Sequence, residues 1–270
     1  MAHLLYGHVI ADGLRINYYR TGGEKPAVVL VHSLGEYGLG WGRFPVFIEP
    51  GYDVTAIDLR GHGMSAKPEQ GYTLENLSAD IFWTIRTLNL IKPVVIGHSL
   101  GAAVTAAFAR THPALISGIV LIDPPWRMEQ SSLEEKILAA QFYLDRIRSL
   151  KAKSLEELME AGRQEHPNWE ESEYMQWAKG IQLVSENTVE WFTTEKRPWQ
   201  EIAAGLTVPG LLLSGEPELG AIVTPQVATA VAGMWKKGEI HHFPGAGHFI
   251  HRDQYFKFRD VVRRFLRYVY

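Results

Sequence analysis

The chain has 270 residues, of which 46% are apolar, 21% are charged and none is cysteine. This apolar fraction suffices for a compact core, which excludes a disordered chain. The lack of cysteine excludes disulfides, a thiol nucleophile and cysteine-ligated metal sites. With 27 basic and 30 acidic residues the net charge is −3, which gives no electrostatic footprint for nucleic acid or an anionic membrane. The length allows one large domain or one domain with an insertion.

The first residues carry no recognisable targeting signal. Residues 1–8 read Met-Ala-His-Leu-Leu-Tyr-Gly-His, with neither a basic start nor an apolar run. No stretch of the chain approaches the roughly 18 uncharged apolar residues that a membrane helix needs. We therefore expect a cytoplasmic protein with no membrane and no nucleic-acid partner.

Strand-like and helix-like segments alternate along most of the chain. Five short, Leu-rich or β-branched runs lack polar alternation, which is typical of strands covered on both faces. Between them, apolar residues recur every three or four positions, as over Leu74–Leu88. This alternation predicts an α/β fold with a mostly parallel, doubly wound sheet, and Asp12-Gly13 predicts an antiparallel hairpin before it. The predicted strands are Ala27–Val31, Val54–Ile57, Pro93–Ile96, Gly118–Ile122 and Gly210–Leu213.

Residues 124–206 break the alternation and read as helices. Ser132 with Glu135, and Ser154 with Glu157, form two capping-box patterns, in which the serine and the glutamate satisfy free N–H groups at a helix start. Five of the eight tryptophans fall in this segment. We expect a helical insertion in the α/β fold, with an apolar stripe at Leu133, Ile137, Ala140, Leu144 and Ile147.

The strongest chemical signal is the sequence Gly97-His-Ser-Leu-Gly101, which follows a predicted strand and opens a predicted helix. A serine at such a sharp turn is pushed above the edge of the sheet, and the two glycines lack the Cβ atoms that would collide there. Ser99 is the candidate nucleophile, and the Leu100 N–H faces the charge that develops on an attacked carbonyl. A serine hydroxyl is a weak nucleophile, so a base must lie against it.

Four further landmarks follow in a fixed order, and with them the chain resembles the α/β-hydrolase superfamily over essentially its whole length. The resemblance implies an α/β-hydrolase core formed by residues 1–123 and 207–270, with residues 124–206 inserted as a helical lid. The landmarks are Val31-His-Ser-Leu-Gly35, Asp58-Leu-Arg-Gly-His-Gly-Met-Ser65, Val208-Pro209 before a strand ending at Gly215, and Pro244-Gly-Ala-Gly-His-Phe249.

The resemblance also assigns roles to residues around the serine. His248 occupies the family's position for the general base, and the Leu34 N–H is the second donor to the oxyanion. An aromatic residue at the position of Trp41 often borders the substrate in relatives, and Trp126 is a candidate lining residue from the insertion. The alternative for both tryptophans is packing in the core.

The acid that orients His248 has three candidates. In the family the late strand is usually followed by Gly-Asp-x-Asp, and this chain has Gly215-Glu-Pro-Glu218 there. We favour Glu218, at the matching offset. Asp123 is the second candidate, because some relatives carry the acid after the strand that here is Gly118–Ile122, and Glu216 is the third. The chosen carboxylate must accept the imidazole N–H and stabilise the imidazolium.

These residues predict a carboxylesterase-like serine hydrolase that cleaves small to medium, apolar acyl or aryl esters through an acyl-enzyme. A lactone hydrolase, or a perhydrolase or C–C hydrolase with the same triad, is an alternative. A receptor that uses the pocket only for binding is an alternative of another class. The serine argues against haloalkane dehalogenase and epoxide hydrolase chemistry, which use Asp in this fold. Neither a phosphate loop nor a zinc motif is present, so we expect no cofactor and no metal.

Overall fold

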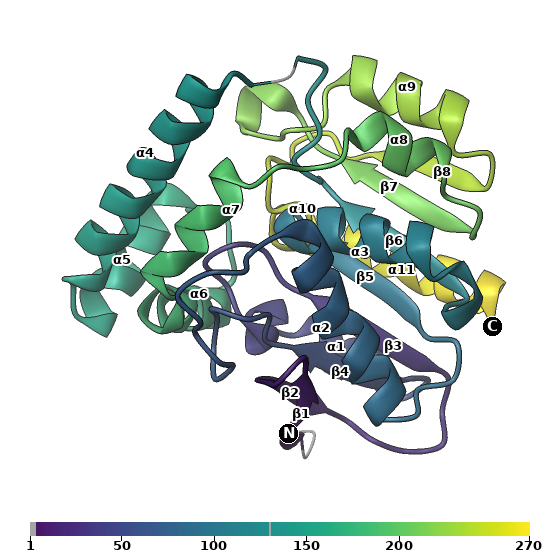
Figure 1. The fold of residues 1–270 in the computed structure, drawn as a ribbon. Coiled ribbons are helices and arrows are strands. Elements are labelled where there is room, and N and C mark those ends of the chain that lie inside the picture. The colour runs from purple at the N-terminus through teal and green to yellow at the C-terminus, as the bar shows by residue number, and fades with distance from the viewer. Residues whose placement is uncertain (1–3, 130) are drawn as a thin grey trace.

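The computed structural model describes residues 4–129 and 131–270, and its strands form one eight-stranded sheet in the order β1-β2-β4-β3-β5-β6-β7-β8 (Figure 1). β3 to β8 run parallel, while the β1–β2 hairpin joins β4 in antiparallel fashion. The strands are β1 (Leu5–Ala11), β2 (Leu14–Arg20), β3 (Ala27–Val31), β4 (Asp53–Ile57), β5 (Val94–His98), β6 (Gly118–Ile122), β7 (Gly210–Ser214) and β8 (Gly238–His242).

The α/β class, the five buried strands and the opening hairpin are confirmed. Every residue of β3 to β7 is buried, because alternate side chains enter two different apolar clusters. In β3, for example, Val29 and Val31 pack with one helical layer, and Val28 and Leu30 with the other. The hairpin turns at Asp12 and Gly13, which both have positive φ, as a two-residue turn between twisted strands requires.

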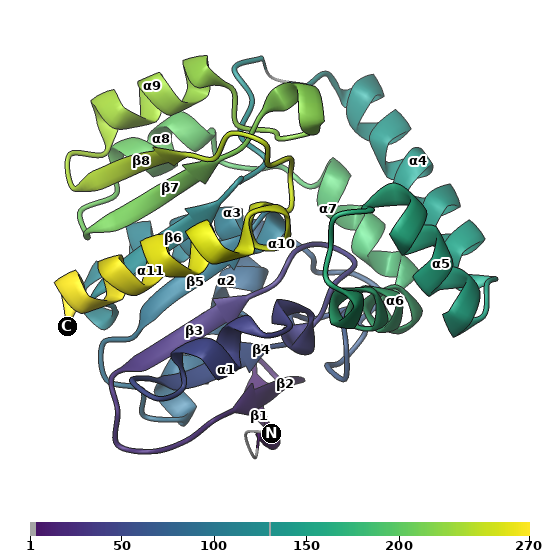
Figure 2. The ribbon, with the colours of Figure 1, turned by 180° about the vertical axis from the view of Figure 1, so that it is seen from behind.

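Helices cover both faces of the sheet (Figures 1 and 2). One face packs against α2 (Leu74–Thr87), α3 (Leu100–Thr111), α8 (Trp199–Ala204) and α9 (Pro225–Met234), and the other against α1 (Phe44–Ile48), α10 (Ile250–Asp253) and α11 (Tyr255–Val269). Short 3₁₀ helices occur at η1 (Gly38–Trp41), η2 (Pro113–Leu115) and η4 (Pro217–Leu219). Among the described residues, no helix has the length and apolar character needed to span a membrane.

The segment between β6 and β7 forms a separate group of helices beside the carboxyl ends of the strands (Figure 1). Before α8 it contains α4 (Leu133–Lys151), α5 (Leu155–Glu165), α6 (Glu171–Leu183), η3 (Glu186–Val189) and α7 (Glu190–Thr193). Both expected capping boxes are present. This insertion has an apolar cluster of its own, made of Ile147, Leu150, Leu158, Trp169, Tyr174, Trp177, Ala178, Ile181 and Val184.

Only part of the stripe expected along α4 is buried. Ile147 is buried in the cluster of the insertion, but Leu133 is 66% exposed and Ile137 is 53% exposed. The first half of α4 extends beyond the helices that could cover it, whereas its second half lies against α6 and α7. Helical periodicity therefore identified the helix, but it did not identify which turns are packed.

Candidate active site

Ser99 lies in a strained turn between β5 and α3, as its sequence motif indicates. Its φ is +53°, a value that non-glycine residues rarely adopt. A Cβ atom on Gly97 would collide with the carbonyl of Gly101, and one on Gly101 with the carbonyl of Val31. The Ser99 N–H donates to the carbonyl of Ile122 over 2.8 Å. The two glycines thus permit the close packing that holds the serine at the edge of the sheet.

His248 follows β8 and lies against a carboxylate at the same edge of the sheet. Its Nδ1 is 2.6 Å from Oδ2 of Asp123. Because a carboxylate accepts hydrogen bonds, Nδ1 carries the hydrogen and Nε2 keeps the lone pair that a general base needs. Asp123 is fully buried and also accepts the backbone N–H groups of Ile222 and Val223, over 2.8 Å and 2.9 Å. These donors fix the carboxylate for its contact with His248.

The preference for Glu218 as the partner of His248 is therefore wrong, and the second candidate, Asp123, occupies that position. Glu218 is exposed on η4. The extra residues of this loop form the 3₁₀ turn, which ends at Gly220 with a left-handed φ of 94°. The turn leads Ile222 back to Asp123 by its backbone N–H. Glu216, the third candidate, is also in this loop, where its N–H donates to Ala246.

Leu34 lies in the loop after β3, at the carboxyl edge of the sheet. Among the described residues, neither the Leu34 nor the Leu100 N–H donates a hydrogen bond to the protein, as the proposed role of oxyanion donor requires. His32 holds the loop: its Nδ1 donates to the Ser33 carbonyl over 2.7 Å and its Nε2 accepts from the Leu59 N–H over 3.0 Å. Burial lowers the pKa of His32, which keeps the imidazole neutral and able to make both bonds.

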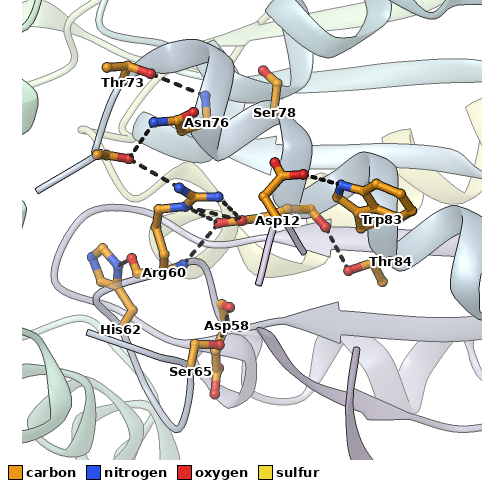
Figure 3. Close-up of polar contacts among 12 residues, drawn as sticks. Asp12, Asp58, Arg60, His62, Ser65, Thr73, Asn76, Ser78, Trp83 and Thr84 are labelled. Atoms are coloured by element: carbon orange, nitrogen blue, oxygen red, sulfur yellow. Dashed lines mark hydrogen bonds and ion pairs between the residues drawn. The ribbon is translucent and has the colours of Figure 1, made fainter. Parts of the chain in front are cut away.

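Asp58 supports the same loop from the end of β4. Its fully buried carboxylate accepts the Gly38 N–H over 2.6 Å, the Met64 N–H over 2.9 Å and the Asn17 side-chain amide over 2.9 Å. The Ser65 hydroxyl donates to the Asp58 carbonyl over 2.6 Å, and Figure 3 shows the two side chains next to each other. Asp58 thus holds in place the loop after β3, residues 32–40, which is called the oxyanion loop below after its proposed role.

Three buried side chains beneath the site, Glu36, His98 and His251, could offer ligands to a metal, since their ligand atoms lie within 4.8 Å of one another. The guanidinium of Arg252, however, is 2.6 Å from Oε1 of Glu36. Burial alone would raise the pKa of Glu36, but the adjacent Arg252 guanidinium holds it well below its ordinary value. The carboxylate charge is already balanced, and a divalent ion would lie beside a cation, so this cluster fits an ion pair better than a metal site.

Trp41 and Trp126, the two candidate substrate contacts, both lie in packed clusters. Trp41 is 3% exposed and packs against Phe44 and His251, with ring centroids 6.3 Å and 5.3 Å apart. Trp126 is 3% exposed and stacks on Trp199 at 5.6 Å. These contacts support the core-packing alternative, and we propose no substrate contact for either residue.

A doubly wound sheet with a strained serine turn and a His–Asp pair at its carboxyl edge defines a class of hydrolytic enzymes. The chain belongs to the alpha/beta hydrolase family, which its residues 28–261 match.

Known proteins agree with this assignment. The chain is 31% identical to 2-(acetamidomethylene)succinate hydrolase of Mesorhizobium japonicum over 115 residues, which are 43% of this chain and 41% of that protein. The chain covers only 30–45% of the curated relatives it matches. The fold matches esterase RhEst1 from Rhodococcus sp. ECU1013 (TM-score 0.79, 20% identity, 100% of both chains). It also matches the enol-lactonase from Burkholderia xenovorans LB400 (TM-score 0.75, 21% identity, 96% of this chain and 99% of that one).

Proposed function

We propose that the protein is a serine esterase that cleaves carboxylic esters through an acyl-enzyme, with Ser99 as nucleophile, His248 as general base and Asp123 as acid. The observation that carries the proposal is the 2.6 Å contact between His248 and Asp123. With Nδ1 bound to Asp123, the lone pair of His248 Nε2 is available to a proton donor. Ser99 and Asp123 directly follow the neighbouring strands β5 and β6, so both lie at the same edge of the sheet. Residues 124–206 act in this proposal as a lid on the core formed by residues 1–123 and 207–270.

The proposed reaction uses only side chains and backbone groups of this chain. His248 Nε2 takes the proton of Ser99 as its oxygen attacks the ester carbonyl, and the Leu34 and Leu100 N–H groups bind the oxyanion. The imidazolium, stabilised by Asp123, then protonates the leaving alcohol. Water attacks the acyl-enzyme with His248 again as base, which releases the acid and regenerates Ser99.

The two buried arginines of the described chain offer no cation to a substrate carboxylate. The two arginines that are buried among the described residues are both paired, Arg60 with Asp80 at 2.7 Å and Arg252 with Glu36 at 2.6 Å. Neither guanidinium is free to bind a substrate carboxylate. We therefore propose apolar acyl or aryl esters as the substrate class. A lactone reacts by the same steps, with the leaving alcohol still attached to the acyl group, and is the second candidate.

A chromogenic panel tests this function. It comprises nitrophenyl esters from acetyl to octanoyl, a carboxylated ester and simple lactones, together with a fluorophosphonate that labels activated serines. We expect turnover of the neutral esters, one label per chain, and loss of both in Ser99→Ala, with kcat lower by about 10⁴-fold or more. Labelling that persists in Ser99→Ala contradicts the nucleophile. Saturable binding without turnover of any ester or lactone indicates a receptor instead.

A further inference from the structure

Helix α6 of the insertion lies directly on the oxyanion loop. A Cβ atom on Gly180 would be 2.8 Å from the carbonyl oxygen of Gly35, so a glycine is needed for the helix to approach this closely. One turn earlier, the Tyr37 hydroxyl donates to Oε1 of Gln176. The backbone of the loop that carries the Leu34 N–H is therefore in contact with the insertion as well as with the sheet.

A single buried guanidinium joins these two elements. Arg252 follows four residues after His248 and is 4% exposed. Its Nη2 is 2.6 Å from Oε1 of Glu36 in the oxyanion loop and 2.8 Å from the Gly40 carbonyl. Its Nε donates to Oε2 of Glu173 on α6 over 3.2 Å. The guanidinium also lies over the ring of Trp169, 4.5 Å from its centroid.

Glu36 connects Arg252 to Ser33 in the oxyanion loop and to His98, the residue before Ser99. Its Oε2 accepts the Ser33 N–H over 3.4 Å and lies 3.4 Å from Nδ1 of His98. His98 Nε2 is 2.9 Å from the His248 carbonyl, which only accepts, so Nε2 carries a hydrogen. In neutral His98, Nδ1 then presents a lone pair to the Glu36 carboxylate. The carboxylate therefore depends on Arg252 for its stability at this position.

We infer that Arg252 is a positioning residue for the proposed reaction, which ties Glu36 to Glu173 and thereby fixes the oxyanion loop against α6. The inference rests on the proposed function. It makes the insertion part of the support of the oxyanion hole rather than only a cover over the substrate. Since the Leu34 N–H meets full negative charge only in the transition state, a loosened loop lowers kcat and leaves KM nearly unchanged.

Two substitutions disturb this support from different sides. Arg252→Lys keeps the positive charge but removes the fork that reaches both carboxylates. Gly180→Ala places a methyl group against the Gly35 carbonyl and leaves all charges intact. We expect each to lower kcat by about 10- to 100-fold with KM within about threefold, less than the loss of a whole oxyanion donor. The affinity for an aryl boronic acid, whose adduct with Ser99 carries the anionic oxygen, should fall by the same factor as kcat/KM.

Each variant has a matched control in this chain. Arg20→Lys alters another forked arginine pair, with the buried Asp53, at the amino end of β4 and thus at the opposite edge of the sheet from the oxyanion loop. Gly162→Ala places a methyl group 3.1 Å from the Tyr174 ring, in the apolar cluster of the insertion. Both controls are expected to lower the temperature of unfolding while the folded protein keeps wild-type kcat and boronate affinity.

The outcomes separate the inference from the function on which it rests. If wild-type protein fails to react with the fluorophosphonate, the proposed function is wrong. If it reacts, and folded Arg252→Lys and Gly180→Ala keep kcat within about twofold, the positioning role is wrong. Equal losses of kcat in the two controls also overturn it, because they show a general effect of weakened packing. Gly180→Ala decides the question should Arg252→Lys not fold.

Discussion

The sheet and the helical insertion bury their side chains in different ways. All five residues of β5 are buried, as are all five of β6, and the catalytic candidates Ser99 and Asp123 directly follow these two strands. In α4, by contrast, only Ile147 and Leu150 of 19 residues are buried. A strand that is packed on both faces cannot shift without breaking contacts on one of them. The residue that directly follows such a strand is therefore fixed in place as well. A helix with one packed end is held by far fewer contacts.

The tryptophans show where the insertion is nevertheless firmly held. Trp169 and Trp177 belong to its own apolar cluster, whereas Trp126, Trp191 and Trp199 pack into the main core. The insertion is thus joined to the core near both of its chain ends and, through α6, at the oxyanion loop. Helix α6, in the middle of the insertion, contacts the oxyanion loop. The first half of α4, by contrast, is largely exposed to solvent.

The largest effect that tests this comparison concerns the acid at the end of β6. Asp123→Asn removes the carboxylate that orients His248 and stabilises its cation, so kcat should fall by about 10³- to 10⁴-fold, with the fold retained. Steady-state kinetics on the best neutral ester measures the loss, and circular dichroism checks the fold.

Glu218→Gln is the matched control for this variant, because it makes the same kind of change on the exposed loop that follows β7. We expect its kcat to stay within about twofold of wild type. A large loss of kcat in Glu218→Gln together with a small loss in Asp123→Asn would mean that Glu218, not Asp123, acts as the acid. It would also show that position at the end of a buried strand does not determine the role.

The parts of the site that follow directly from strands could be predicted from the sequence. The strained turn at Ser99 and the position of His248 were predicted because their glycine-rich turns have steric requirements that few other sequences meet; their catalytic roles stay predictions. The carboxylate partner of His248 was misplaced because an exposed acidic residue and a buried one look alike in a sequence. The useful signal was the position of Asp123, directly after a wholly apolar strand beside the strand of the serine.

The contacts around Arg252 could not have been found in the same way. Glu36, Glu173 and Arg252 are separated by more than 70 residues at each step, and each lies in a segment where a charged residue is ordinary. Only the docking of α6 on the oxyanion loop brings them together, and docking depends on side-chain shape rather than periodicity. The same limit applies to α4, whose apolar spacing predicted burial for turns that nothing in the described chain covers.

The next largest effect is the pH dependence of stability that histidines buried in the core should cause. Burial lowers the pKa of His62 to about 3, so below pH 6.5 the unfolded chain binds a proton there that the folded chain does not. Stability therefore falls as pH falls from about 6.5 toward 3, by up to about 1.4 kcal/mol per pH unit for each such histidine. Urea unfolding between pH 7.5 and 5 measures this slope. Burial also lowers the pKa of three further core histidines, His32, His98 and His251.

A pair of variants isolates the contribution of one histidine. His62→Gln should reduce the slope below pH 6.5 by about one proton, whatever its effect on stability at neutral pH. Thr105→Val, which changes another buried side chain but removes no titratable group, should leave the slope unchanged. An unaltered slope in His62→Gln would mean that acid destabilises another part of the molecule first, with the insertion as the next place to examine.

The smallest effect compares two helix starts that have the same local geometry. Ser132 and Ser154 each accept the N–H three residues on over 3.2 Å, and the glutamate there accepts each serine N–H over 2.7 Å. Behind Ser154, α5 buries Leu158 completely, whereas the first turns of α4 bury nothing. Ser154→Ala should therefore lower the free energy of unfolding by about 1 kcal/mol.

Ser132→Ala should instead loosen only the start of α4, because turns that are not packed can open without unfolding the rest. We expect a change in global stability of less than about 0.5 kcal/mol, with faster hydrogen exchange confined to residues 133–138. Equal global losses in the two variants would show that the exposed half of α4 unfolds together with the core. The insertion would then be as firmly held as the sheet, and the contrast between the two regions would lie in solvent exposure alone and not in stability.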